Sequence, residues 1–174
     1  MKADANTGEI VAKSAEFAGG GQLLPQIAAG GGKIYIFGLE TDGSRIYAFD
    51  QGDMSLSFKT AVISGRQIES PILYYDGYVY AGVYGGSKEK PAQFACFDAT
   101  KDSDGELAPT WTYSETVYHN RGGYLWSGPT IVGEAIVFTN TNGYITSLNR
   151  KTGEMIDTYL IPEDFQGGEQ LTTT

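Results

Sequence analysis

The chain has 174 residues and a net charge of −9 at pH 7, from 21 acidic and 12 basic side chains. A chain this acidic is a poor electrostatic match for phosphate backbones and anionic lipid, which disfavours nucleic-acid binding. The 24 glycines and the 13% of aromatic residues favour an all-β fold of short strands joined by tight turns. No stretch approaches the length of a membrane-spanning helix, so we expect no membrane insertion.

The N-terminal residues 4–11 (DANTGEIV) are similar to residues 149–156 (NRKTGEMI) near the other end of the chain. In both, an Asp or Asn precedes a Thr-Gly-Glu turn and an apolar pair. We therefore expect residues 1–16 to form the outer strand of a β-unit whose first strands are not among these residues.

A first complete unit is expected over residues 22–63. Its sequence begins at Pro25, and residues 33–37 and 45–50 alternate as strands do. An Asp-Gly hairpin turn at residues 41–44 joins these two strands. An outer strand is predicted over residues 54–63.

Two further units repeat this order over residues 68–113 and 126–161, beginning at Pro71 and Pro129. Their predicted strands cover residues 78–84, 93–98 and 110–113 in the second unit, and residues 135–139, 144–149 and 155–160 in the third. The prolines at 25, 71 and 129 are 46 and 58 residues apart, and a four-stranded propeller blade takes about 40–50 residues. Residues 163–174 form a polar C-terminal tail.

The sequence pattern shared by these units resembles the PQQ-like β-propeller repeat, also called the quinoprotein repeat. The resemblance rests on DGYVYAG at residues 76–82, SRIYAFD at residues 44–50 and NRKTGEMID at residues 149–157. It implies β-propeller blades of four antiparallel strands, about three complete blades and a partial one. Such an incomplete ring is either a segment of a larger propeller or associates with a second copy through its exposed blade edges.

The resemblance implies function only broadly, because the family includes quinoprotein dehydrogenases, an outer-membrane assembly scaffold lipoprotein and many surface proteins. The quinoprotein alcohol dehydrogenases use a vicinal disulfide, and this chain has Cys96 as its only cysteine. We therefore expect no catalytic residues and no quinone cofactor. The favoured function is a non-catalytic binding or scaffold module, outside the cell, on its surface or in the periplasm. A fragment of a quinoprotein-type oxidoreductase is the alternative, and a structural spacer is a third hypothesis.

An acidic loop follows the predicted strand at residues 93–98. Four carboxylates make it a candidate calcium site, because hard oxygen ligands suit Ca²⁺. They are Asp98, Asp102, Asp104 and Glu106. The spacing does not match an EF-hand loop, since Thr100 and Trp111 occupy its first and twelfth positions. A solvated acidic hairpin is the other interpretation, and it is the favoured one.

A second candidate site is the aromatic segment between the second and third units. Aromatic rings beside amide and guanidinium donors bind sugars and peptide anchors, so this segment is a candidate site for a protein, peptide or glycan. The residues are Tyr118, His119, Arg121, Tyr124 and Trp126. The favoured alternative is that Tyr124 and Trp126 pack between blades and that His119 caps a loop.

Overall fold

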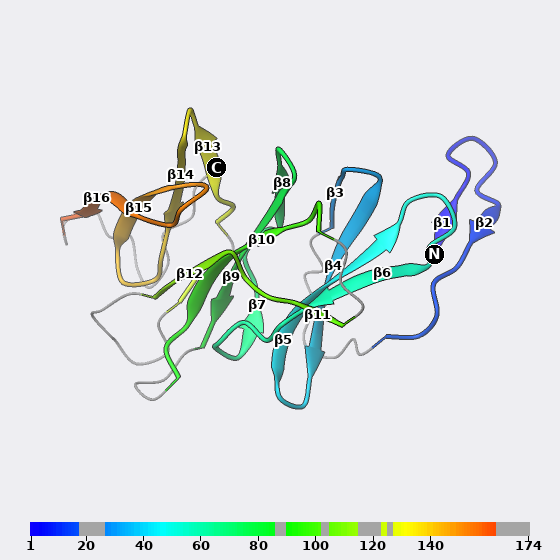
Figure 1. Cartoon of the computed structure of the whole chain (residues 1–174), viewed down its shortest axis with the longest axis horizontal. Coiled ribbons are helices and arrows are strands. Elements are labelled where there is room, and N and C mark those ends of the chain that lie inside the picture. The colour runs from blue at the N-terminus through cyan, green and yellow to red at the C-terminus, as the bar shows by residue number, and fades with distance from the viewer. Residues whose placement is uncertain (18–26, 86–89, 102–104, 115–122, 125–126, 163–174) are drawn as a thin grey trace.

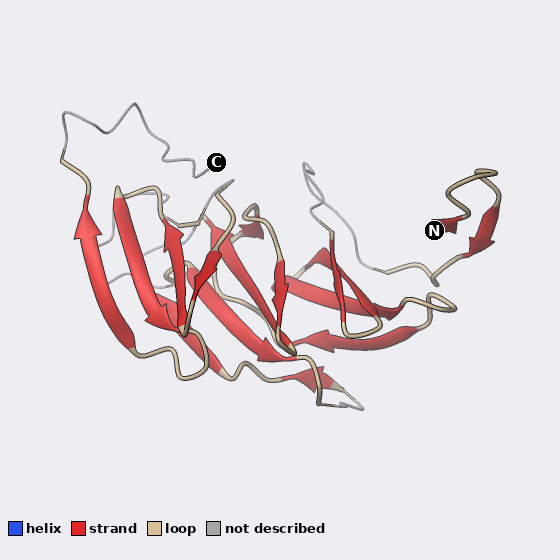
Figure 2. Ribbon diagram, turned by 90° about the horizontal axis from the view of Figure 1, so that it is seen from above, coloured by secondary structure: helices blue, strands red, loops and turns tan. Residues whose placement is uncertain are grey.

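The computed structural model describes residues 1–17, 27–85, 90–101, 105–114, 123–124 and 127–162, and these form only strands, turns and loops. Their strands make three sheets of four or five strands and one N-terminal hairpin. The sheets stand side by side as blades (Figure 2), with the hairpin at one end and the third blade at the other (Figure 1). The predicted all-β class is confirmed. None of the described segments contains a helix long and apolar enough to cross a membrane.

Blade 1 is an antiparallel sheet with one added parallel strand. Its strands are β3 (Ala28–Gly30), β4 (Lys33–Glu40), β5 (Gly43–Asp50), β6 (Leu56–Thr60) and β11 (Glu106–Leu107). The β4–β5 hairpin is longer than predicted, because its pairing continues to Glu40 opposite Gly43 and leaves a turn of only Thr41 and Asp42. The outer strand β6 is shorter than predicted. Its free edge is covered by β11, which comes from the segment between two strands of the next blade.

Blade 2 has its innermost strand divided in two. Its strands are β7 (Gln67–Ile68), β8 (Leu73–Tyr75), β9 (Tyr78–Tyr84), β10 (Gln93–Asp98) and β12 (Trp111–Ser114). The two short strands β7 and β8 pair with opposite ends of β9, and Pro71, which has no N–H to donate, lies between them. The predicted strands at residues 78–84 and 93–98 are confirmed.

Blade 3 is a simple four-stranded meander. Its strands are β13 (Thr130–Val132), β14 (Ala135–Thr139), β15 (Tyr144–Asn149) and β16 (Met155–Leu160). The predicted bounds of the last three strands are confirmed. The Asn142–Gly143 turn between β14 and β15 places Gly143 at a φ of 85°, which glycine adopts without a steric penalty.

Three apolar clusters lie between successive layers of the stack. One joins blades 1 and 2 around Tyr35 and Phe97, and a second joins blades 2 and 3 around Phe94 and Phe138. The third lies on the outer face of blade 1, where Phe17 packs 5.2 Å from the rings of both Tyr47 and Phe49. The stacking of blades therefore buries most of the large side chains, and Phe17 covers the first blade face.

The same turn closes the N-terminal hairpin, blade 1 and blade 3. At each turn an Asp or Asn side-chain oxygen accepts hydrogen bonds from the backbone N–H groups two and three residues later: Asp4, Asp50 and Asn149. The residue four positions later has a positive φ, of 74° at Gly8 and Gly153 and of 65° at Met54. The predicted match between residues 4–11 and 149–156 is thus a match of three-dimensional structure.

The N-terminal hairpin, β1 (Lys2–Ala3) and β2 (Ile10–Ala12), rests on blade 1 in the manner of a blade. The Lys2 ammonium donates to the backbone carbonyls of Gln51 and Gly52, 3.0 and 3.3 Å away. The equivalent residue of blade 2 is Cys96, whose thiol contacts the carbonyl of Arg150 in blade 3. Lys2 lies two positions before Asp4, which opens the shared turn. Cys96 lies two positions before Asp98, which occupies the equivalent position in blade 2.

Candidate functional site

The two described carboxylates of the acidic loop have separate protein partners. Asp98 accepts hydrogen bonds from the hydroxyl and the backbone N–H of Thr100, at 2.6 and 3.1 Å, and these bonds lower the pKa of Asp98. Glu106 lies 2.7 Å from Arg45 of blade 1. Asp102 and Asp104 lie outside the described residues. Within the described ranges, no group of three His, Cys, Asp or Glu side chains is arranged to hold a metal ion, and the calcium site stays a prediction.

Arg45 holds blade 1 to the segment that follows β10. Its guanidinium, only 4% exposed, lies within 3.1 Å of Glu40, Asp42 and Glu106, and it also donates to the carbonyl of Thr60 at 3.0 Å. Because Glu106 belongs to β11, this cluster around the buried Arg45 guanidinium fixes the covering strand to blade 1. A buried cation surrounded by acceptors is costly to break, so the cluster has a structural role.

Glu40 is part of the same cluster and accepts a short hydrogen bond from the Tyr47 hydroxyl. This bond is the largest cause of a lowered pKa for Glu40, and Lys59 and Arg45 lower it further. Burial and the same bond raise the pKa of Tyr47 to about 12. The pair is therefore a carboxylate and a neutral phenol at pH 7, which is a stable arrangement and not a proton-transfer pair.

Arg150 holds blade 3 to blade 2 through both its side chain and its carbonyl. The guanidinium lies 3.2 Å from Asp76 of blade 2 and 3.3 Å from Glu134 of blade 3. Its plane also lies over the ring of Tyr75, 5.2 Å from the centroid, which is a cation–π contact. The buried Arg150 side chain therefore bridges the two blades at their turns.

The carbonyl of Arg150 is the meeting point of three side chains from blade 2. It accepts hydrogen bonds from the Tyr80 hydroxyl at 3.2 Å and the Trp111 indole N–H at 3.1 Å, and the Cys96 sulfur lies 3.9 Å away. Burial raises the pKa of Cys96 to about 12. A neutral, enclosed thiol is a poor nucleophile, so Cys96 is a packing residue, as its apolar sequence context indicates.

Tyr124 corrects one part of the predicted ligand site. Its side chain is 1% exposed and packs edge-on against Phe94 and Phe138, each 5.4 Å away between ring centroids. Gly82 makes room for it, because a Cβ there would lie 2.4 Å from the Cβ of Tyr124. Tyr124 thus packs between blades and does not face a ligand. Tyr118, His119, Arg121 and Trp126 lie outside the described residues, so their part of the prediction stays a prediction.

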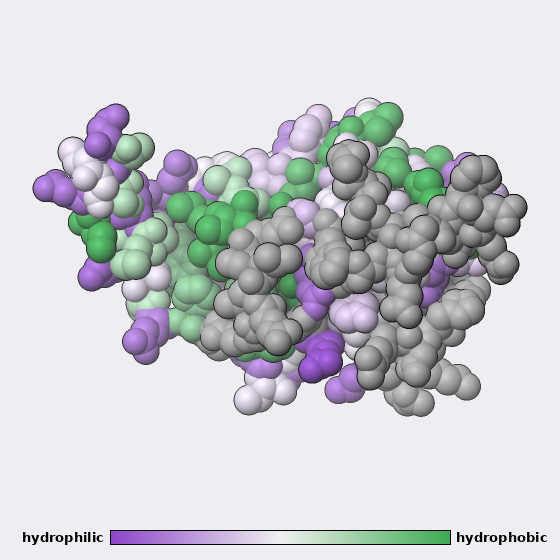
Figure 3. All heavy atoms as spheres, turned by 180° about the vertical axis from the view of Figure 1, so that it is seen from behind, coloured by the Kyte–Doolittle hydropathy of each residue, from purple (hydrophilic) through white to green (hydrophobic). Residues whose placement is uncertain are grey.

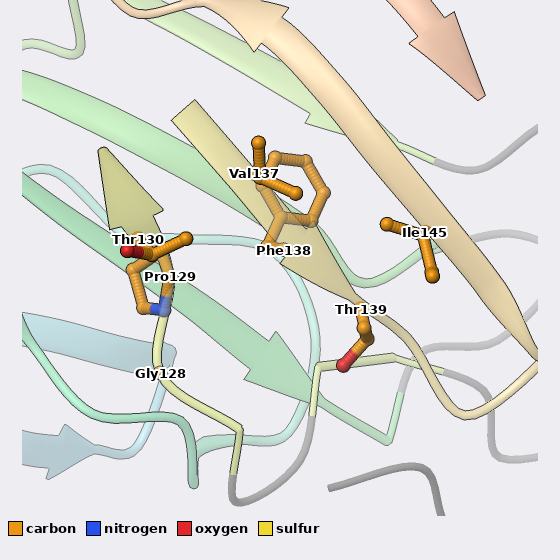
Figure 4. Close-up of a pocket in the computed structure, with 7 residues that line it drawn as sticks. All are labelled: Gly128, Pro129, Thr130, Val137, Phe138, Thr139 and Ile145. Carbon is orange, nitrogen blue, oxygen red and sulfur yellow. The ribbon is translucent and has the colours of Figure 1, made fainter. Parts of the chain in front are cut away.

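A hollow of about 480 Å³ lies on the outward face of blade 3. Its lining residues come from β13, β14, β15 and the approach to β13: Gly128, Pro129, Thr130, Val137, Phe138, Thr139 and Ile145. Figure 4 shows Val137 and Ile145 on neighbouring strands, with Pro129 and Thr130 to one side. We call this surface the open face of blade 3, because the opposite face packs on blade 2 through Ile136, Phe138 and Leu148.

Strand register places no large aromatic ring in the middle row of the open face. In blades 1 and 2, three directly paired residues form a row on the face toward the following blade. The equivalent row of blade 3 lies on its open face. The rows are Tyr35, Ala48 and Phe58 in blade 1; Tyr80, Cys96 and Trp111 in blade 2; and Val137, Ser147 and Asp157 in blade 3. The first two rows place two large rings against the next blade, whereas the third has none. Blade 3 therefore ends the described stack with smaller and more polar side chains.

Sequence reasoning missed Arg45, Arg150 and the open face. The middle residues of the rows could have been found from the sequence, because Ala48, Cys96 and Ser147 each lie two positions before the Asp or Asn that ends the equivalent strand. The other residues of the rows are identified only by strand pairing. Strand pairing then shows that Val137 occupies the position of Tyr35 and Tyr80. Apolar surface is not confined to blade 3, since Figure 3 shows apolar residues gathered also in the half of the molecule nearer the N-terminal hairpin.

No family model and no curated protein matches this chain. Solved structures do match it. BamB from Moraxella catarrhalis is 25% identical, with a TM-score of 0.53, and the match covers 78% of this chain and 35% of BamB. The quinohemoprotein alcohol dehydrogenase ADHIIG from Pseudomonas putida HK5 is 19% identical over 76% of this chain and 20% of its own, with a TM-score of 0.59.

A europium-containing methanol dehydrogenase is also similar, at 12% identity and a TM-score of 0.59, over 76% of this chain and 24% of the enzyme. This chain thus spans about a third or less of each of these three proteins. The predicted fold is confirmed: the chain has the structure of part of a PQQ-like β-propeller.

Proposed function

We propose that this chain is a non-catalytic binding or scaffold module, and that the open face of blade 3 receives an apolar segment of a protein or peptide partner. The observation that carries the proposal is the hollow beside Val137, which occupies the position of Tyr35 and Tyr80 in the other blades. A face with a hollow and an apolar floor suits an inserted apolar side chain better than it suits a sugar, which needs converging polar groups.

The roles of the buried ionisable groups support a structural module. Arg45 and Arg150 each form ion pairs with two or more acidic partners and join neighbouring blades. Cys96 is a neutral thiol in the core. The proposed location is the periplasm, the cell surface or the extracellular space, by likeness to PQQ-like propeller proteins.

The test uses two matched valine-to-tyrosine variants. Val137→Tyr restores the aromatic residue of the other blades and fills the hollow, whereas Val11→Tyr adds the same ring to the exposed N-terminal hairpin. Peptides selected from a displayed random library against the whole chain are then titrated against all three proteins. We expect Val137→Tyr to lose binding and Val11→Tyr to keep it. Equal binding by all three proteins would place the site elsewhere.

The alternative is a fragment of a quinoprotein-type oxidoreductase, which the two dehydrogenases among the similar structures support. It predicts that added pyrroloquinoline quinone binds the chain and changes its absorption spectrum. The binding-module proposal predicts an unchanged quinone spectrum at protein concentrations that saturate the selected peptides.

A further inference from the structure

The outer strand of blade 3, β16, has no pairing partner on its outer edge among the residues that the structure describes. It pairs on one side with β15 and ends the order of its sheet in the described part of the chain. All six of its residues are exposed. The equivalent strand of blade 1, β6, has its edge covered by β11 in a parallel pair. Within this one chain, therefore, an outer edge is covered by adding a strand.

The side chains of β16 do not protect this edge. Proteins usually guard exposed edges with lysine, proline or inward-pointing charges, and β16 (MIDTYL) contains only one charge, Asp157. Its apolar residues are 49–58% exposed: Met155, Ile156, Tyr159 and Leu160. Such an edge is a template for pairing with another strand, through the backbone groups that β15 does not use.

We propose that β16 pairs with β16 of a second copy of this chain, antiparallel and about a two-fold axis at Thr158. A two-fold axis normal to the sheet keeps each side chain on its own face of the sheet. The axis therefore passes midway between one residue of β16 and the same residue of the second copy. An axis at Asp157 would place two carboxylates opposite each other, which is unfavourable. An axis at Thr158 pairs the two threonines instead.

The other pairs of this register are also favourable. Ile156 lies opposite the partner's Leu160, and Asp157 lies opposite the partner's Tyr159. The apolar pair stabilises the neighbouring strands, and the second pair places no like charges opposite each other. The strand is thus complementary to itself in this register, which is the property that a two-fold interface requires. The occupant of the edge is for this reason a second copy and not a different protein.

The interface adjoins the open face of blade 3 and shares Asp157 with its row, but it does not use the residues that line the hollow. The edge uses the backbone of β16, whereas the hollow is lined by β13, β14 and β15. Each copy carries a net charge of −9, so the two copies repel each other at long range. Because salt screens this repulsion, we expect dimerisation to strengthen as the salt concentration rises.

The decisive test is a pair of neighbouring cysteine variants in the full chain. In the proposed register Thr158→Cys faces its own copy across the axis, at a Cα separation within disulfide range, whereas Asp157→Cys faces the partner's Tyr159. The native Cys96 is buried and does not compete. Under mild oxidation we expect Thr158→Cys to give a covalent dimer and Asp157→Cys to give little. Equal cross-linking of both variants, or of neither, overturns the proposal.

Sedimentation equilibrium of the wild-type chain tests the same inference without a mutation. We expect a reversible dimer whose dissociation constant rises about tenfold in Leu160→Lys, with an unchanged far-UV circular dichroism spectrum, because two cross-strand pairs are lost. Val137→Tyr should leave the dimer unchanged, which separates this result from the peptide-binding test. A wild-type monomer overturns the proposal. If that monomer protects the β16 amides from hydrogen exchange, the chain's own residues cover the edge.

Discussion

The substitution Gly153→Ala tests the contact between the turn of blade 3 and Trp111 of blade 2. Gly153 has a φ of +74°, and a Cβ built there would lie 2.7 to 2.9 Å from three atoms of Trp111. The indole cannot move away cheaply, because its N–H donates to the carbonyl of Arg150 at 3.1 Å and its ring stacks on Phe94. The added methyl group therefore meets a fixed ring.

Two costs add up in this variant. A left-handed backbone costs a residue with a side chain about 1–2 kcal/mol, and overpacking a core contact costs about 1–3 kcal/mol. We expect Gly153→Ala to lower the free energy of unfolding by about 2–5 kcal/mol. Gly133→Ala, in the same blade, is the matched control, because Gly133 has a φ of +59° and nothing within 4 Å of the added Cβ. It should cost only about 1–2 kcal/mol.

Urea unfolding followed by far-UV circular dichroism measures both variants, and a Trp111→Leu background completes a double-mutant cycle. In that background, Gly153→Ala should lower the free energy of unfolding by no more than Gly133→Ala does. The reasoning is refuted if the two alanine variants are equally stable in the wild-type background, or if the extra cost persists without the indole.

Three further predictions follow from the buried groups. The folded-state pKa of Glu40 is lowered chiefly by the Tyr47 hydroxyl, so the stabilisation it provides is full above the unfolded value of 4.5 and is lost as the pH falls through the folded value. Tyr47→Phe should therefore be less stable than wild type in urea at pH 7, and the difference should shrink at pH 3; a constant difference would contradict this. Cys96, with its pKa raised to about 12, should not react with a thiol reagent at pH 8 until urea unfolds the chain, and fast labelling of the folded chain would be the contrary result. Phe138→Ala should cost about 3–5 kcal/mol in urea unfolding, since the ring is 2% exposed and stacks 4.1 Å from Phe94, and a cost below about 1 kcal/mol would show that the blade interface closes over the cavity.

The longer strands of blades 2 and 3 could be predicted from the sequence because they are runs of β-forming residues ended by a turn residue. Residues 144–149 are an example: Asn142-Gly143 precedes them and the Asn149 turn follows them. The short strand β11 could not be predicted, because two residues carry no periodic pattern. It forms only because Leu107 is buried beside blade 1 and Glu106 reaches Arg45, which is 61 positions earlier in the chain.

The candidate site shows the same division between local and long-range information. An aromatic residue such as Tyr124 looks alike in a sequence whether it binds a ligand or fills a core, and only Gly82 and Phe94 on a distant strand pair decide between the two. The hollow on blade 3 depends on register, since Val137 lies beside Ser147 and Asp157 only after three strands have paired.

The contacts that hold successive layers together are not equally strong along the stack. Between blades 2 and 3, Cys96 acts with Tyr80 and Trp111 on one buried carbonyl. At the equivalent place under the N-terminal hairpin, the exposed Lys2 ammonium reaches blade 1 through water-accessible bonds. In a linear array, stability is the sum of neighbour contacts. A pulling force or a protease should therefore detach the hairpin from blade 1 before the blades separate from one another.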